Sequence, residues 1–220
     1  MSWFRRRSKP VELDALDAYA QWAAAYSPEA HNPLMALEEQ AMVELLPPLA
    51  GQRVLDLACG SGRYLRRIKD DGAAFTLGLD FSGAMLARAV ALGQPLARGD
   101  MLHVPLAAGG WDVVVCGLAV GHVADLASVL GEVARVLAAG GTVVYSDFHP
   151  FGALAGWKRS FRGRDGRDYS ARHHIHLYAD HQAACQAAGL AITAVREPRI
   201  DFEHPYRGFP AVLVIRAGKP

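Results

Sequence analysis

One stretch constrains the fold of this chain more than any other: VLDLACGSGRY, residues 54–64. Its apolar start is typical of a buried strand, and its end is typical of a polar helix start. Gly60 and Gly62 lie between them, where glycine lets the backbone approach a ligand without an intervening Cβ. Ligands of open α/β sheets bind where strands end in such bends. The stretch therefore predicts an α/β fold with a ligand site after its first long strand.

The remaining chain alternates between apolar strand-like runs and helical periodicity, as parallel sheets covered by helices do. Two helices are expected first, over 11–26 and 32–46, the second capped by Asn32 with Pro33 at its first position. The stretch 199–208 is not helical, so the last two strands should pair antiparallel. Strands are expected near 53–58, 75–80, 95–98, 111–116, 141–147, 190–196 and 211–216.

These elements predict a doubly wound, Rossmann-like sheet of seven mostly parallel strands with an antiparallel C-terminal strand. Two N-terminal helices and an insertion after the fifth strand complete the predicted fold. The 220 residues suit a single domain, 1–220, in which 1–10 is expected to be a flexible tail and 150–177 a substrate-covering insertion.

Composition narrows the classes of protein and partner. The net charge of +1 marks neither nucleic acid nor an anionic membrane as a partner, and no apolar run approaches the roughly 20 residues of a membrane span. Cys59, Cys116 and Cys185 are widely spaced, which indicates neither a disulfide framework nor a metal site. A cytoplasmic protein without a bound metal is expected, and its oligomeric state is left open.

The chemistry of the ligand follows from acidic residues at the predicted strand ends. A dinucleotide fingerprint needs a third glycine where Leu65 stands, and Asp56 precedes the glycines rather than following them. A carboxylate at Asp56 can anchor an ammonium group, and Asp80, at the end of the next strand, can accept both hydroxyls of a ribose. Asp100 and Met101 offer an acceptor and an apolar wall to an adenine. The ligand therefore combines an amino acid with a nucleoside.

In order and position, these motifs resemble the class I S-adenosylmethionine-dependent methyltransferases, especially small single-domain enzymes similar to the ubiquinone-biosynthesis and malonyl-carrier-protein methyltransferases. The resemblance spans most of the chain, with Ala58 in place of the first glycine of the family motif. It implies S-adenosyl-L-methionine as cofactor. The cofactor-binding residues that it implies are Asp56, Ala58, Gly60, Gly62, Asp80, Phe81, Met85, Asp100, Met101 and Gly117, with Tyr19 and Tyr26 of the N-terminal helix as a cover.

Methyl transfer is an in-line displacement that depends mainly on alignment and exclusion of water. A carboxylate acceptor needs no base, whereas a phenol or an alcohol profits from one. His122 and His149 follow the fourth and fifth predicted strands, so both are candidate catalytic bases. Either histidine can instead serve as a structural donor to a loop carbonyl.

The insertion after the fifth strand is unusually basic, with six Lys or Arg against two Asp between residues 157 and 172. Arginine binds carboxylates bidentately, so the insertion favours an acidic acceptor, although a merely solvated loop fits the same charges. His173, His174 and His176 are spaced poorly for a metal. The predicted substrate-binding residues are Arg159, Arg162, His174, Tyr178 and Trp22.

The predicted function is methyl transfer to a small acidic or aromatic metabolite, at oxygen, nitrogen or carbon. Methylation of a nucleic acid or of a carrier-protein-bound substrate is an alternative, although the segment CGLAVG has none of the residues expected for base methylation. A nicotinamide-dependent oxidoreductase shares the sheet but needs the missing glycine. A non-catalytic S-adenosylmethionine-binding module would keep Asp56 and Asp80 without needing His122 or His149.

Overall fold

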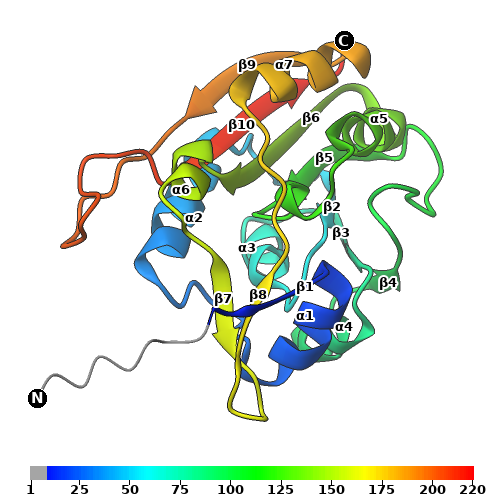
Figure 1. Cartoon of the computed structure of the whole chain (residues 1–220). Helices are drawn as coiled ribbons and strands as arrows, with labels where there is room; N and C mark the ends of the chain where they lie inside the picture. The colour runs from blue at the N-terminus through cyan, green and yellow to red at the C-terminus, as the bar shows by residue number, and fades with distance from the viewer. Residues whose placement is uncertain (1–8) are drawn as a thin grey trace, which may run out of the picture.

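A seven-stranded sheet runs through the centre of the molecule (Figure 1), in a computed structural model that describes residues 9–220. Residues 1–8 of the predicted tail lie outside the described residues. The strand order is β4-β3-β2-β5-β6-β10-β9, and β10 alone runs antiparallel to its neighbours. The strands are β2 (Arg53–Leu57), β3 (Phe75–Asp80), β4 (Leu96–Arg98), β5 (Trp111–Cys116), β6 (Leu137–Phe148), β9 (Ala191–Arg196) and β10 (Val212–Gly218). The predicted doubly wound sheet with its antiparallel C-terminal strand is confirmed.

Alternating side chains of the central strands bury two separate apolar layers. Along β5, Val114 and Cys116 join the layer that contains α5 (Leu126–Val136) and α7 (Tyr178–Ala187). Val113 and Val115 point the other way, into the layer that contains α2 (Pro33–Leu45) and α3 (Arg63–Asp70). This period of two, buried on both faces, explains why these strands read as continuous apolar runs.

Helices begin where the sequence supplies caps. The Asn32 side chain accepts a hydrogen bond from the Met35 amide at 2.9 Å, and Pro33 opens α2 as expected. Ser82 caps α4 (Gly83–Ala89) in the same way. Among residues 9–220, no helix combines the length and the apolar character that crossing a bilayer requires.

The prediction of one continuous helix over 11–26 is wrong at its start. Val11–Leu13 is a strand, β1, and Asp14 caps the following helix α1 (Ala15–Trp22), which ends in a short 3₁₀ turn over Ala23–Ala25. β1 pairs in parallel with β8, with Val11 opposite Tyr169. The strand conformation thus depends on a partner far along the chain, which local periodicity does not reveal.

That partner belongs to the predicted insertion. After a short helix α6 (Pro150–Leu154), the insertion forms an antiparallel hairpin of β7 (Arg159–Arg162) and β8 (Asp168–Ala171). With β1, the hairpin makes a second, three-stranded sheet. Ala18 of α1 packs against Phe161 and Tyr169 of this small sheet, so the N-terminal segment and the insertion form one layer next to α4 (Figure 1). Its role over a substrate stays a prediction.

A buried polar cluster lies between β6 and α7. The hydroxyl of Tyr145 lies 3.3 Å from Nδ1 of His181 and 3.7 Å from Sγ of Cys185. Nε2 of His181 is buried with no partner among the described residues. Burial, and then the neighbouring His176, lower the pKa of His181 to about 4, so the native fold holds this imidazole neutral.

This burial predicts acid sensitivity. Between about pH 6.5 and pH 4, the unfolded chain protonates His181 while the folded protein does not, so the stability contributed by the neutral histidine is lost as the pH falls, by about 3 kcal/mol in total. Measured by urea denaturation, the free energy of unfolding of wild type should therefore fall more between pH 7 and pH 4 than that of His181→Gln. The expected difference between the two falls is this same amount, about 3 kcal/mol. The exposed His103, changed to Gln, is the control; parallel curves for wild type and His181→Gln would contradict the assignment.

Candidate active site

A cavity of about 440 Å³ opens at the carboxyl ends of β2, β3 and β5, between the large sheet and α1. This volume suits a small ligand. The structure brings most of the predicted site residues together at its wall. These are Tyr19, Trp22, Tyr26, Asp56, Ala58, Gly60, Asp80, Phe81, Met85, Asp100, Met101, Gly117, His122 and Arg159.

The bend after β2 is shaped by residues in the left-handed region. Gly60 has φ +55° and Gly62 has φ +88°, conformations that glycine adopts without steric cost. Gly62 does not line the cavity: it is the N-cap residue of α3, and a Cβ there would clash with the Leu92 side chain. Ala58 also has a positive φ, +57°, which costs an alanine roughly 1–2 kcal/mol. Alanine in place of the first glycine of the motif therefore has two effects: it adds a methyl group at the cavity wall, and it makes the backbone conformation at this position less favourable.

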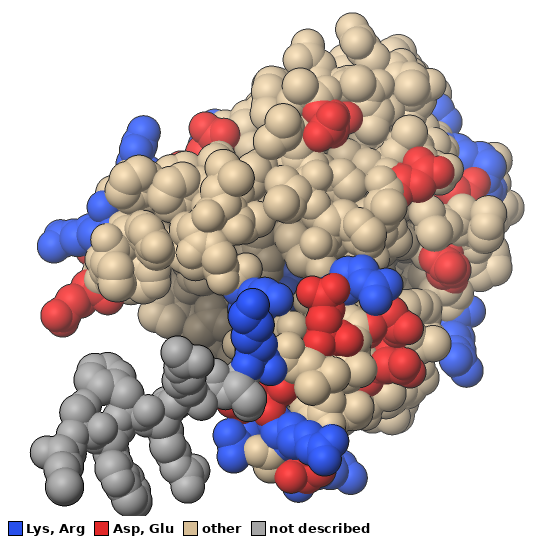
Figure 2. Space-filling model, in the orientation of Figure 1, with Lys and Arg blue, Asp and Glu red and all other residues tan. Residues whose placement is uncertain are grey.

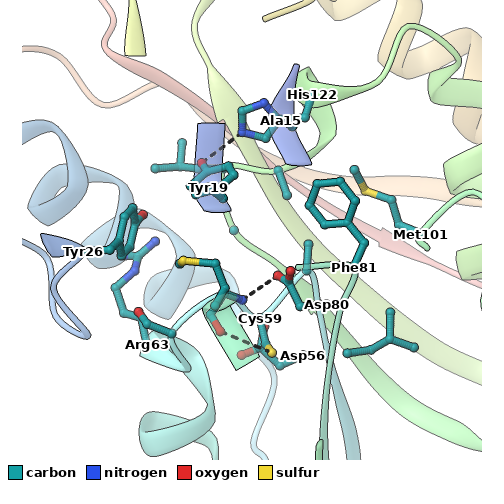
Figure 3. Close-up of a pocket in the computed structure, with 18 of the residues that line it drawn as sticks. Ala15, Tyr19, Tyr26, Asp56, Cys59, Arg63, Asp80, Phe81, Met101 and His122 are labelled. Atoms are coloured by element: carbon teal, nitrogen blue, oxygen red, sulfur yellow. Dashed lines mark hydrogen bonds between the residues drawn. The ribbon is translucent and has the colours of Figure 1, made fainter. Parts of the chain in front are cut away.

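Two buried carboxylates lie at one end of the cavity (Figure 3). Asp80 accepts the Gly60 amide on Oδ2 and the Ser82 amide on Oδ1, both at 2.8 Å. Asp56 has one oxygen, Oδ2, with no partner among the described residues. Burial raises the pKa of both carboxyls, that of Asp56 strongly, against the opposing charge of Arg63. This end of the cavity therefore favours a cationic or hydrogen-bond-donating ligand group.

The third acidic strand end differs from the first two. Asp100 is exposed, and its Oδ1 accepts the Leu102 amide at 2.9 Å, closing a tight turn. Phe81 and Met101 stand on the same side of the cavity in Figure 3. Together with the buried Met85, they make an apolar wall beside a hydrogen-bond acceptor.

A buried ion pair next to the bend was not predicted from the sequence. Glu38 of α2 is completely buried and accepts hydrogen bonds from Arg63 at 2.7 Å, Tyr64 at 2.9 Å and Ser146 at 2.6 Å. Arg63 lines the cavity as the first residue of α3. A signal was present: along α2, Glu38 occupies the same buried stripe as Met35, Met42 and Leu45, where an acid needs a partner.

The same network holds the turn after β5. Leu118, which lines the cavity, has φ +54°, a strained value for a residue with a branched side chain. Its amide donates to Ser146 Oγ at 2.8 Å, and its carbonyl accepts from Arg159 at 2.9 Å. Bonds on both sides of the residue therefore fix the conformation.

At the other end of the cavity, three segments meet at one point. Nη1 of Arg159 donates to the Tyr19 hydroxyl at 2.7 Å and contacts Nε2 of His122. The Tyr19 hydroxyl lies 3.1 Å from the same Nε2 (Figure 3). Nδ1 of His122 lies 3.1 Å from the carbonyl oxygen of Arg172. Because a carbonyl only accepts, Nδ1 carries the hydrogen and Nε2 is the acceptor.

This geometry bears on both candidate bases. Burial, and then the charge of Arg159, hold the pKa of His122 well below its usual range, and its Nε2 lone pair already faces a guanidinium. His149 is not at the cavity: it caps α6, accepting the Phe151 amide on Nδ1, while its Nε2 faces Glu197 at 3.3 Å. The expectation that His149 lies beside the acceptor is wrong, because the chain turns into α6 where β6 ends.

Three of the predicted substrate-binding residues also lie elsewhere. Arg162 points to solvent and pairs with Asp168 at 3.1 Å. His174 is half-buried outside the cavity wall, its amide bonded to the Gly121 carbonyl at 2.7 Å, and Tyr178 is 42% exposed at the start of α7. Of the predicted set, Arg159 and Trp22 line the cavity, and Trp22 stacks between Tyr19 and Phe161.

Comparisons with known proteins agree with this geometry. A family model described as "Methyltransferase domain" matches residues 55–145. A demethylmenaquinone methyltransferase of Corynebacterium kroppenstedtii is 33% identical over 51% of this chain and 48% of its own length. A malonyl-[acyl-carrier protein] O-methyltransferase of Pectobacterium atrosepticum is 31% identical over 67% of this chain and 57% of its own length. This chain therefore spans about half the length of the curated relatives that it matches.

Among solved structures, an S-adenosylmethionine-dependent methyltransferase from Mesorhizobium loti is similar with a TM-score of 0.68 and 25% identity. The similarity covers 83% of this chain and 98% of that one. The likeness thus extends beyond the matched domain to nearly the whole of a solved methyltransferase.

The Glu38 network leads to a stability prediction. Glu38→Gln removes the charge that faces the buried Arg63, and breaking a buried pair from one side costs about 3–5 kcal/mol. Glu39→Gln removes the same charge next to it, but its side chain is 37% exposed and its contact with Arg63 is 3.4 Å, so we expect a loss below about 1 kcal/mol. Urea denaturation of the two variants measures the difference. Similar losses in both would show that the buried carboxylate is not the anchor of this region.

Proposed function

Because the chain belongs to the class I S-adenosylmethionine-dependent methyltransferases, we propose that it transfers a methyl group from S-adenosyl-L-methionine to a small acidic or aromatic acceptor. The observation that carries the proposal is the pair of buried carboxylates, Asp56 and Asp80, at the ends of neighbouring strands in one cavity. Three free buried cysteines accord with the reducing cytosol in which we place the protein.

The residues present fit this cofactor. The unpartnered Oδ2 of Asp56 would accept its ammonium group, which adds a directly bonded positive charge to the influence of Arg63. Each oxygen of Asp80 accepts one backbone amide and has a second lone pair for a ribose hydroxyl. Phe81, Met85 and Met101 would flank the adenine, with Asp100 as the acceptor for its amino group.

When bound, S-adenosylmethionine supplies an electrophilic methyl group on a sulfonium sulfur. The work left to the chain is to hold two molecules in line and to keep water out, and alignment alone can contribute roughly 7–11 kcal/mol to lowering the barrier. Tyr19 and Trp22 of α1 and Arg159 of the insertion line the cavity, and under this proposal their layer would cover the bound molecules. A cover of this kind strengthens electrostatic interactions inside the site, because it excludes water.

His122 holds Arg159 and Tyr19 in place in this arrangement. For His122 to accept a proton from an acceptor molecule, Arg159 would first have to turn away from Nε2. An acceptor that is already ionised needs no such step. Of the two relatives named above, one is named for a malonyl acceptor on a carrier protein, which carries a carboxylate and corresponds to the alternative of a carrier-bound acceptor, and the other is named for a quinone-type acceptor.

Direct binding tests the cofactor. We expect calorimetric titration of the wild-type protein to show binding of S-adenosylmethionine and S-adenosylhomocysteine and none of NADH. Asp56→Asn should lower the affinity of the protein for both sulfur nucleosides by about 10- to 100-fold, because a hydrogen bond to a charged group contributes about 1.5–3 kcal/mol. Asp71→Asn, which removes a surface charge paired with Arg67, is the matched control and should change nothing.

Asp56 is a cleaner position for this test than Asp80. Replacing Asp80 by Ala would leave two buried amides, those of Gly60 and Ser82, without an acceptor, so lost binding would be confounded with a disturbed bend. Binding of NADH alone, or equal affinities in wild type and Asp56→Asn, would contradict the proposed cofactor site.

A further inference from the structure

Arg159 differs from the other basic side chains of the insertion. On the surface, Lys158 and Arg172 face Glu12 at 3.8 and 3.5 Å, and Arg167 faces Asp165 at 3.7 Å. Figure 2 shows this intermixing of basic and acidic side chains on the face that carries β1, β7 and β8. Four of the five other basic residues of the insertion therefore face an acid at the surface, and Arg159 is the member that lines the cavity.

The guanidinium of Arg159 has only neutral partners among the described residues. Nη1 contacts the Tyr19 hydroxyl, the Leu118 carbonyl and His122, and the ring of Phe148 lies 4.7 Å from the guanidinium carbon. Nη2 is buried and has no hydrogen-bond partner. Burying a cation that has an unused hydrogen-bond donor costs free energy unless an anion pairs with it.

Among the described residues, no acid forms an ion pair or a hydrogen bond with the guanidinium of Arg159. Burial raises the pKa of the nearby Asp147 to about 7, against the effect of Arg159 itself, so this carboxyl is only partly ionised at neutral pH, and its Oδ2 has no partner. Burial and the charge of Arg159 lower the pKa of His173, which lies 3.6 Å from Asp147, to about 3. With His122 neutral as well, this end of the cavity carries a net positive charge at neutral pH.

We propose that Arg159 is the specificity-determining residue of the acceptor site and binds a carboxylate of the methyl acceptor through its guanidinium. This inference rests on the proposed function and narrows its acceptor to carboxylic acids. Tyr19 and Phe148 contact the guanidinium, and Trp22 and Tyr26 line the same cavity, so we expect an acid with an apolar body such as an aromatic ring. The guanidinium carries one positive charge, which balances the single negative charge of a carboxylate, whereas a phosphate dianion would keep one negative charge uncompensated in the cavity.

The test is calorimetric titration of the full chain saturated with S-adenosylhomocysteine, using benzoate, the neutral isostere benzamide, and phenyl phosphate as probes. We expect wild type to bind benzoate more tightly than either of the other two. Arg159→Gln should lower the affinity for benzoate by at least about 10-fold and leave the affinity for benzamide unchanged. The matched control is Arg162→Gln, which removes the same charge from the same strand outside the cavity and should leave all three affinities unchanged.

The outcomes separate this inference from the proposed function. Failure of wild type to bind S-adenosylhomocysteine would overturn the proposed function itself. With that nucleoside bound, equal affinities for benzoate and benzamide, no benzoate binding, or tighter binding of phenyl phosphate would overturn the carboxylate site alone. These wild-type comparisons do not depend on any variant folding. Unchanged benzoate affinity in an Arg159→Gln protein that keeps its melting temperature would also overturn the assignment.

Discussion

The rest of the site depends on the buried carboxylate of Glu38. It has no exposed surface, and its hydrogen-bond donors come from α3, through Arg63 and Tyr64, and from β6, through Ser146. Because a desolvated charge is stable only with its donors in place, this carboxylate ties three elements to one geometry. Ser146 connects this carboxylate to the turn after β5, because its hydroxyl donates a hydrogen bond to Glu38 and accepts one from the Leu118 amide.

That constraint on the turn after β5, together with a separate backbone bond after β2, explains how the cavity keeps two unfavourable backbone conformations. Ala58 and Leu118 both have positive φ and both line the wall, one after β2 and the other after β5. Strain of this kind persists only where surrounding bonds fix it. Ala58 precedes Cys59, whose amide bonds to the Leu79 carbonyl at 3.0 Å, and Leu118 is held at both its amide and its carbonyl. The two turns that face the ligand are thus rigid before it binds, which lowers the entropy lost on binding.

The large sheet and the acidic end of the site were predictable because both are encoded locally. Continuous apolar runs identify buried strands, and Asp56 and Asp80 follow from the positions where those runs end. The small sheet was not predictable, because β1 takes its conformation from β8, far along the chain. Which arginines of the insertion point toward the cavity was missed for a different reason: net charge does not tell which way a side chain points. The alternation of side chains along β7 does give this direction, because Arg159 and the buried Phe161 share one face of the strand, whereas Arg162 lies on the other.

The two ends of the cavity present different groups, buried carboxyls at one end and a guanidinium at the other, and this difference suits the cavity to hold two different molecules. Asp56 and Asp80 present acceptors at one end, and Arg159 presents a donor at the other, with Tyr19 beside it. A cavity whose walls exclude water strengthens both attractions. Under the proposed function, the ammonium and hydroxyl groups of the methyl donor would bind to the carboxyls at one end, and the carboxylate of the acceptor would bind to the guanidinium at the other. The reacting atoms would then meet between the two ends, so these end groups would orient the pair before any contact specific to the acceptor's shape is made.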